Sequence, residues 1–299
     1  MFVRKTDLDF SASDAVGDAP DLRAAYQTCR EITRIASKTF YLASLFLSAE
    51  KRRAVWAVYA FCRTADDVVD RTAPAGDRLA ALDELERKLI AMSAGHANEP
   101  IFIAYADAAR RFNIPLEPAL ALLRGARMDI TIRRYATFEE LCEYCYLVAS
   151  TVGLLVSPIL GTSGDEALPF GVTLGRAMQL TNILRDVGED SLMGRIYLPA
   201  EDLERFGYAE NGVFEQVVDD KFIALMQFQI ARVRALYAEA EPGIALLSPE
   251  SRYTVRLALS LYRGILNAIE LNGYNVFSRR AYVPLRSKIA TALGVALAR

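Results

Sequence analysis

The chain has 299 residues, of which 53% are hydrophobic and 24% are charged, an ordinary globular composition. A chain of this length can bury roughly 75% of the surface that its unfolded form exposes, so it needs no structural metal or disulfide. The 35 Lys and Arg nearly balance the 37 Asp and Glu, which argues against a nucleic-acid-binding protein. With His96 as its one histidine, the sequence excludes His-rich zinc sites and disfavours a His-based catalytic triad.

The first part of the chain differs in composition from the rest. Residues 1–20 are polar and contain no apolar run of the kind that a secretory signal requires. From residue 21 to residue 299, apolar side chains recur at three- and four-residue spacing, and turn signals such as 73–76 separate the segments. No alternating strand pattern of useful length occurs. We therefore predict a polar leader at 1–20 and one all-α domain at 21–299.

Two predicted helices, at 137–160 and 252–271, are apolar on more than one face. Such helices lie inside a bundle or line an apolar cavity. The longest uncharged apolar stretch, 147–160, is too short to cross a bilayer. We expect a cytoplasmic protein and leave open a peripheral contact with a membrane. Of the four cysteines, Cys142 and Cys145 form a C-x-x-C pair within an apolar helical segment, where we expect buried structural thiols.

A first group of carboxylates follows the apolar helical run 54–62. Arg63 precedes Asp66 and Asp70, which lie one turn apart on the same face if the helix continues. A second group of polar residues is spaced through another apolar segment. If that segment is a helix, with about 100° per residue, the members of the group fall within an arc of roughly 80° around its axis. They are Gln179, Asn182, Asp186 and Asp190.

Oxygen ligands without Cys or His select Mg²⁺ or Mn²⁺, and Mg²⁺ is commonly held by a few carboxylates together with substrate phosphates. Two facing acidic helices that bind a metal–diphosphate would satisfy this chemistry. Arg63 and Arg185 stand beside the acidic groups as cationic partners for a diphosphate. Lys38 lies between Ser37 and Thr39, whose hydroxyls fit either a helix N-cap or a phosphate contact. No P-loop or dinucleotide-binding motif occurs.

Together, these segments resemble the squalene/phytoene synthase family of head-to-head prenyl transferases, and most closely its phytoene synthases. The resemblance covers about residues 22–290 and implies an all-α isoprenoid-synthase bundle around a deep apolar cavity. Some family members have a histidine where this chain has Ala36, so that imidazole has no counterpart here. Five segments carry the resemblance, in order: 37–41, 59–70, 146–153, 179–199 and 272–280.

Carried over residue by residue, the resemblance implies roles for particular side chains. The implied metal ligands are Asp66, Asp70, Asn182, Asp186 and Asp190. The implied catalytic residues are the same four aspartates and Arg63. The implied substrate contacts are Ser37, Lys38, Thr39, Tyr59, Arg63, Tyr146, Gln179, Arg185 and Tyr274.

The implied reaction condenses two geranylgeranyl diphosphates through a cyclopropylcarbinyl diphosphate to phytoene, a step of carotenoid biosynthesis, with Mg²⁺ or Mn²⁺ and no nicotinamide cofactor. A C30 synthase that uses farnesyl diphosphate is the alternative, because chain length depends on the depth of the cavity. A head-to-tail transferase or terpene cyclase fits the second acidic group poorly. A non-catalytic helical lipid-binding protein, the alternative from a different class, would gain nothing from buried carboxylates that lack a cation.

Overall fold

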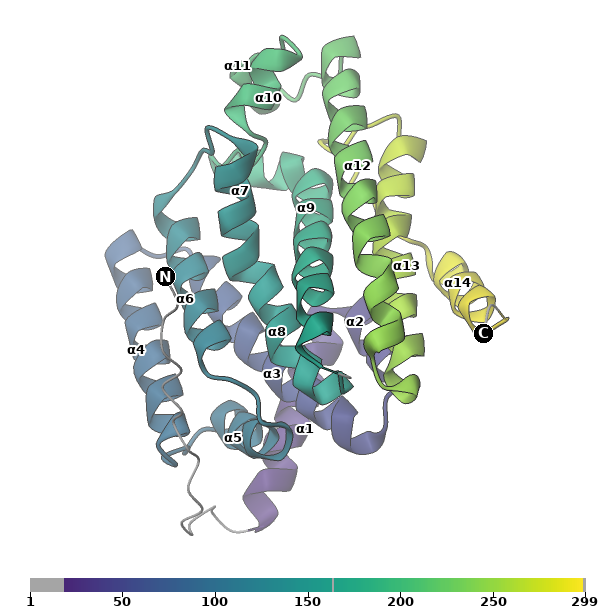
Figure 1. Ribbon diagram of the computed structural model, residues 1–299. Coiled ribbons are helices and arrows are strands. Elements are labelled where there is room, and N and C mark those ends of the chain that lie inside the picture. Colours follow the sequence, from purple (N-terminus) through teal and green to yellow (C-terminus); the bar gives the residue numbers. More distant parts are fainter. Residues whose placement is uncertain (1–18, 163, 298–299) are drawn as a thin grey trace.

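The structure is a computed structural model that describes residues 19–162 and 164–297 (Figure 1). In this part of the chain, all the regular elements are helices; two isolated β-bridges occur and no strand. This confirms the predicted all-α class. The predicted leader falls largely on residues 1–18, outside the described residues. The α-helices are α1 (Ala19–Ala36), α2 (Lys38–Ser44), α3 (Ala49–Val69), α4 (Ala75–Ser93), α5 (Pro100–Phe112), α6 (Glu117–Thr131), α7 (Phe138–Cys145), α8 (Thr151–Leu160), α9 (Leu168–Leu192), α10 (Ala200–Arg205), α11 (Glu210–Phe214), α12 (Asp220–Ala240), α13 (Pro249–Leu271) and α14 (Leu285–Leu297). A π-helical turn, η1 (Tyr146–Ser150), and two 3₁₀ helices, η2 (Asp165–Ala167) and η3 (Glu241–Leu246), complete them.

Helix α3 is the centre of a first group of packed helices. The hydroxyl of Ser48 accepts a hydrogen bond from the Lys51 backbone N–H and so caps the start of the helix. Trp56 and Phe61 are among its many buried residues, and they pack within a cluster that includes side chains of α1, α4, α5, α6 and α8. The first acidic segment is therefore attached to a helix that the cluster holds firmly in place.

Helix α9 is the centre of a second group. It is 25 residues long and packs against α12, α13 and the π-helical turn η1. Buried side chains on its apolar faces, such as Leu180 and Leu184, join a cluster formed chiefly with α12 and α13. Each acidic segment thus lies on the central helix of its own cluster, and the two clusters are distinct.

Helices α7 and α8 form one continuous helix through η1. The Thr151 N–H donates to the carbonyl of Tyr146, the five-residue spacing of a π-helix. The whole helix, Phe138–Leu160, has 23 residues and a mean hydropathy of 1.5 over an 18-residue window, so by length and composition it could cross a membrane. This agrees with the prediction of one helix at 137–160, whose uncharged part, 147–160, is shorter because Glu139, Glu140 and Glu143 lie in its first turns. In the bundle it packs against α6 and α9 (Figure 1).

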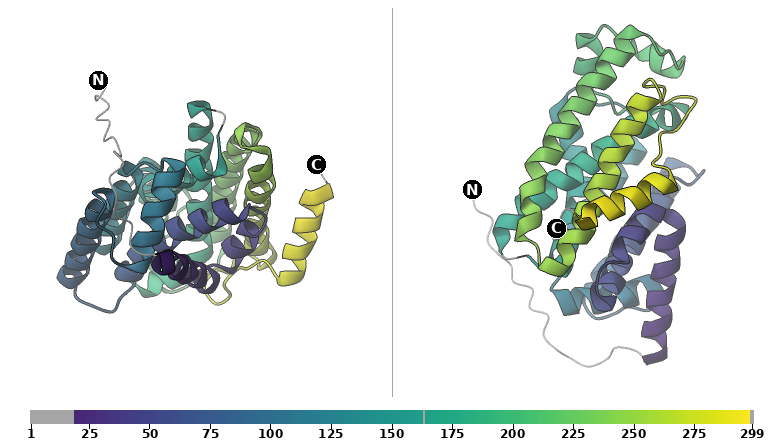
Figure 2. Two further views of the ribbon diagram at one scale, coloured as in Figure 1. Left: turned by 90° about the horizontal axis from the view of Figure 1, so that it is seen from below. Right: turned by 90° about the vertical axis from the view of Figure 1, so that its right-hand side faces the viewer.

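The chain returns to α9 between α13 and α14. An added Cβ on Gly188 would lie 2.7 Å from the Cα of Phe277, so glycine lets the returning backbone touch α9 beside the second acidic segment. Helix α14 then stands at the edge of the bundle beside α13 (Figure 2). The Tyr253 hydroxyl on α13 donates to the Ala292 carbonyl at 2.8 Å, which fastens α14 by one face.

Candidate active site

The first acidic segment lies at the end of α3. Asp70 is the C-cap, and its N–H donates to the carbonyl of Asp66, so the helix continues through the segment as predicted. Arg63 forms an ion pair with Asp67 at 2.6 Å. Asp66 reaches solvent, yet the surrounding protein desolvates it. This desolvation, with repulsion from Asp129 and Asp70 and partly offset by Arg63, raises the pKa of Asp66 to about 7. A bound cation would stabilise the ionised form of a carboxyl that is desolvated in this way beside other carboxylates.

The second acidic segment occupies one face of α9, as predicted. Asp186 is held by two guanidinium groups: the Arg185 Nε donates to Oδ1 at 2.7 Å, and its Nη2 contacts the other carboxylate oxygen. The Arg280 Nε also donates to Oδ1, at 3.0 Å. Desolvation and the charge of Asp186 raise the pKa of Asp190 to about 7, against an opposing effect of Arg195. Asp186 is therefore neutralised by arginines, whereas Asp190 is not.

Gln179 and Asn182 lie on the same face of α9, one turn apart. The Asn182 Nδ2 lies 3.5 Å from the Gln179 Oε1, a long hydrogen bond between two partly buried amides. Both amides precede Asp186 along the face, so the predicted oxygen ligands form one row.

Asp129, on α6, lies between the two acidic segments, and the sequence analysis missed it. It raises the pKa of both Asp66 and Asp190, so it is within electrostatic reach of each. Two phenols donate to its carboxylate, from Tyr144 at 2.9 Å and from Tyr197 at 2.7 Å. Burial nevertheless raises the pKa of Asp129 itself. The structure thereby joins α3, α6 and α9 around one group of carboxylates.

A buried arginine balances part of this negative charge. Arg195 is 6% exposed, and its Nε has no hydrogen-bond partner among the described residues. Its charge opposes the raised pKa values of Asp129 and Asp190. The rings of Tyr135, Tyr144 and Tyr197 stack or tilt against one another at centroid distances of 5.3–5.8 Å. These three rings form an aromatic group beside Asp129.

Ser37, Lys38 and Thr39 form the start of α2. Ser37 accepts from the Phe40 N–H at 3.3 Å, which confirms the N-cap reading for that hydroxyl. Lys288, on α14, donates to Thr39 Oγ1 at 2.8 Å. Desolvation and the nearby charge of Lys38 lower the pKa of Lys288. Two lysines from opposite ends of the chain therefore lie close together here.

Tyr59 and Tyr262 connect the start of α2 with the second acidic segment. The ring of Tyr59 stacks on Phe40 with 4.8 Å between centroids. Desolvation and the nearby Tyr262 raise the pKa of Tyr59 to about 12. Tyr262, on α13, in turn interacts electrostatically with Arg185 and Asp186. Most predicted substrate contacts therefore belong to one connected group.

Two of the predicted substrate contacts, Tyr146 and Tyr274, interact with parts of the protein other than the two acidic segments. Tyr146 is 38% exposed and lines a surface cleft of about 730 Å³ together with Glu139 and Arg176. Tyr274 follows α13 in a left-handed backbone conformation with φ of 63°, and its hydroxyl accepts from Gln227 at 3.2 Å. Their assignment to substrate remains a prediction.

The cysteines play no part in this site. Cys29, Cys62 and Cys145 are buried and Cys142 is partly buried, all as free thiols. Burial raises the pKa of each, to about 12 for Cys29, so none is activated as a thiolate. Cys145 is thus buried as predicted, whereas Cys142 is buried only in part.

The donor set of the site fits a hard cation. Within the described ranges, no three His, Cys, Asp or Glu side chains are arranged as a ready cage for a metal ion. The acidic segments nevertheless offer only oxygen ligands, and Asp66 and Asp190 are both desolvated beside other carboxylates. Mg²⁺ held jointly by such carboxylates and by substrate phosphates suits this arrangement.

A sequence profile described as Squalene/phytoene synthase matches residues 33–287. The chain belongs to the squalene/phytoene synthase family. It is 43% identical over 290 residues to a 15-cis-phytoene synthase of Synechococcus elongatus, covering 93% of this chain and 94% of the relative. It is 46% identical over 277 residues to a 15-cis-phytoene synthase of Synechocystis, covering 89% and 82%.

The family relationship extends to solved structures. A ligand-bound dehydrosqualene synthase superposes with a TM-score of 0.88 at 35% identity, covering 93% of this chain and 98% of that one. The predicted isoprenoid-synthase type of all-α fold and the class of prenyl-transferring enzyme are thus confirmed.

Proposed function

We propose that this family member condenses two molecules of geranylgeranyl diphosphate head to head into phytoene. The observation that carries the proposal is the identity of 43–46% to phytoene synthases over most of the chain. The 35% identity to a dehydrosqualene synthase is lower. The connected acidic and basic residues at the ends of α3 and α9 support the diphosphate chemistry.

The reaction requires two diphosphates to leave. Bound Mg²⁺ or Mn²⁺ would stabilise the negative charge that develops on each leaving group. Asp66 and Asp70 on α3 would hold it from one side, and Asn182, Asp186 and Asp190 on α9 from the other. Asp129, which acts electrostatically on both Asp66 and Asp190 and accepts from two phenols, supports this arrangement.

Basic residues around the metal ligands would bind the diphosphates. Arg185 and Arg280 both pair with Asp186. If Asp186 held a cation, both guanidinium groups would be available to phosphate oxygens, which they can hold bidentately. Lys38 and Lys288, close together at the start of α2, are suited to a second diphosphate.

The atoms of the reaction balance without a redox partner. The C1–O bond of the donor breaks, and its allylic cation adds across the double bond of the second substrate. Loss of one proton leaves a cyclopropylcarbinyl diphosphate; loss of its diphosphate, rearrangement and loss of a second proton give the C40 hydrocarbon. Aromatic faces such as the stacked Phe40 and Tyr59 can stabilise the cations and exclude water. No nicotinamide cofactor is needed.

The decisive experiment supplies purified protein and Mg²⁺ with geranylgeranyl or farnesyl diphosphate, with and without NADPH, and analyses the extracted hydrocarbons. Phytoene from the C20 substrate without NADPH is the expected product. A favoured C30 product would move the function to squalene-type or dehydrosqualene-type synthesis with the same site. No product from either substrate by the folded protein would favour the lipid-binding alternative.

We propose a cytoplasmic protein that touches a membrane at its periphery, because its product is insoluble in water. One side of α14 exposes Ile289, Leu293 and Leu297, by 54%, 62% and 87%. Flotation with liposomes should recover the natural protein and lose the double variant Ile289→Asp/Leu293→Asp. Equal recovery of the two would contradict the contact. This variant keeps Lys288 and its bond to Thr39, which truncation of the helix would remove.

A further inference from the structure

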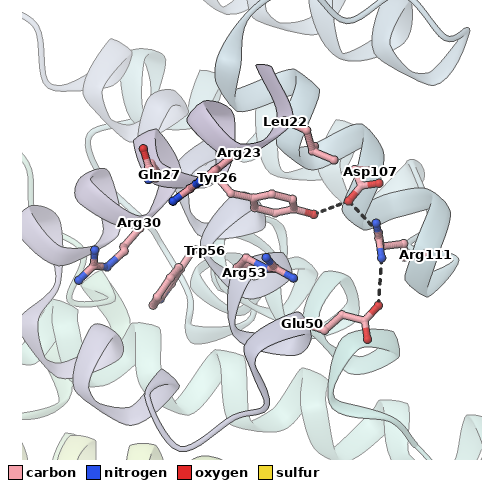
Figure 3. Close-up of a pocket in the computed structure, with 10 residues that line it drawn as sticks. All are labelled: Leu22, Arg23, Tyr26, Gln27, Arg30, Glu50, Arg53, Trp56, Asp107 and Arg111. Carbon is pink, nitrogen blue, oxygen red and sulfur yellow. Dashed lines mark hydrogen bonds and ion pairs between the residues drawn. The ribbon is translucent and has the colours of Figure 1, made fainter. Parts of the chain in front are cut away.

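A second cleft lies between α1, α3 and α5, at the far end of α3 from the acidic residues (Figure 3). Its volume is about 420 Å³, within the range of small-molecule sites. Arg53 in the cleft is 13 residues before Asp66 on the same helix, which at 1.5 Å per residue is about 20 Å. The cleft is therefore separate from the candidate active site. It is lined by Leu22, Arg23, Tyr26, Gln27, Arg30, Glu50, Arg53, Trp56, Asp107 and Arg111.

The carboxylates of the cleft are already matched. Asp107 is buried and accepts from the Tyr26 hydroxyl at 2.9 Å and from the Arg111 Nε at 2.8 Å. Arg110, just outside the cleft, also pairs with Asp107 at 3.0 Å. The Nη1 of Arg111 lies 3.4 Å from Glu50. The two acidic side chains thus have their counter-charges from α5.

Three further arginines have no such match. Within the described part of the chain, no carboxylate forms an ion pair with Arg23 or Arg53, and the guanidinium of Arg53 lies over the ring of Tyr26 at 5.6 Å. The Arg30 Nε donates to a neutral partner, the Tyr41 hydroxyl, at 3.3 Å. Figure 3 shows Arg23, Arg53 and Trp56 around the same part of the cleft. The cleft therefore holds an excess of positive charge beside aromatic rings.

We propose that this cleft binds a phosphorylated small molecule. Guanidinium groups hold phosphate oxygens in a planar, bidentate way, and a group that carries two negative charges suits several unmatched arginines better than a single carboxylate does. Leu22, Tyr26 and Trp56 provide the apolar wall for the remainder of the ligand. A soluble phosphate compound and an anionic lipid headgroup share this chemistry.

The cleft contains its own spectroscopic probe. Trp56 is the only tryptophan of the chain. Its ring stacks on Tyr41 with 5.6 Å between centroids and an interplanar angle of 15°, and Tyr41 is also the partner of Arg30. A ligand that draws Arg30 away from Tyr41 changes the surroundings of Trp56. Binding should therefore alter the tryptophan fluorescence.

The test titrates the full chain in EDTA with ATP, with inorganic diphosphate, and with vesicles of phosphatidylglycerol or of phosphatidylcholine. We expect a saturable change in fluorescence with ATP, diphosphate or phosphatidylglycerol vesicles, and none with phosphatidylcholine. Arg53→Gln should weaken the affinity at least tenfold, whereas the control Arg124→Gln, an exposed arginine on α6 that pairs with Glu117 away from the cleft, should stay within about twofold. Circular dichroism checks that both variants fold.

Each outcome decides the proposal. A response confined to the anionic vesicles assigns the site to a lipid headgroup, and a response confined to the soluble phosphates assigns it to a free ligand. Absence of any response overturns the proposal, as does an Arg53→Gln variant that titrates like the natural protein. Loss of the response in Arg185→Gln, with Arg53→Gln unaffected, would place the binding in the candidate active site instead. The assay contains no prenyl substrate, so it does not depend on the proposed reaction.

Discussion

The two acidic segments have the same spacing of aspartates but different surroundings. On α3, Arg63 pairs with Asp67, and Asp66 is left among other carboxylates. On α9, Asp186 is bound by the guanidinium groups of Arg185 and Arg280. If a cation binds as proposed, the α3 segment is open to it, whereas on α9 the cation would have to replace two arginines at Asp186. This exchange would couple binding of the cation to binding of the diphosphate.

The largest effect should come from the open segment. Asp66→Asn should reduce the rate of hydrocarbon formation about 10³-fold, because the cation at a leaving diphosphate contributes several kcal/mol to the transition state. The matched control is Asp67→Asn, whose carboxylate pairs with Arg63 and is no predicted ligand; it should lose about tenfold or less. Equal losses, measured as kcat with saturating Mg²⁺, would contradict the assignment of Asp66.

An arginine of the second segment should have opposite effects on cation and substrate. Arg280→Gln should raise the KM for the prenyl diphosphate about tenfold and lower the half-saturating Mg²⁺ concentration about threefold, because Asp186 loses a competing partner. The neighbouring Arg279→Gln should change neither by more than twofold. If Arg280→Gln weakens both the cation and the substrate, the proposed exchange does not occur.

The pH dependence of metal binding should reveal Asp129. The pKa values of Asp66 and Asp190 are raised to about 7, so protons compete with Mg²⁺ below that pH. Asp129→Asn removes one cause of both shifts and should strengthen Mg²⁺ binding about threefold at pH 6, with little change at pH 8. Tyr144→Phe removes a hydrogen bond but keeps the charge, so its pH dependence should match that of the natural protein. Calorimetric titration at the two pH values measures both.

The smallest effect concerns the stability of the metal-free protein. A carboxyl whose pKa is raised by folding stabilises the folded state below its unfolded value near 4, and this contribution is lost as pH rises towards 7. The Tm in EDTA should therefore fall between pH 5 and pH 8. Asp66→Asn should raise the Tm at pH 8 by about 1–3 °C. Glu166→Gln, an exposed carboxyl of η2, should leave it unchanged; a lower Tm for Asp66→Asn would contradict the repulsion.

Much of the site could be predicted because its parts are local. The predicted ligands on α3 and α9 recur every three or four residues, so helical spacing alone places each set on one face. Asp129, Tyr144 and Tyr197 could not be found in this way. Each comes singly from its own part of the chain, and the two tyrosines are 15 and 68 residues from the aspartate that they contact. Only packing of α6 against its neighbours brings such residues together.

The fold shows the same limit. Apolar periodicity predicted the helical class and the helix at 137–160, which the structure gives as Phe138–Leu160, but not the π-helical turn within it. Such a turn depends on a local shift of the backbone hydrogen bonds to five-residue spacing, which the pattern of apolar side chains does not specify. The hydrogen bonds of η1 carry the helix through Tyr146 without a break.

The π-helical turn η1 also limits how this enzyme can be redesigned. A Cβ added to Gly175 of α9 would lie 2.6 Å from the Ala149 carbonyl oxygen, so main chain touches main chain there. Substitution of smaller side chains therefore cannot widen the space between η1 and α9 at this point. The same close approach recurs one turn further along, where a Cβ added to Gly153 of α8 would lie 2.7 Å from the Gly171 carbonyl oxygen of α9. Laboratory evolution towards longer or shorter hydrocarbons should therefore leave Gly153 and Gly175 unchanged.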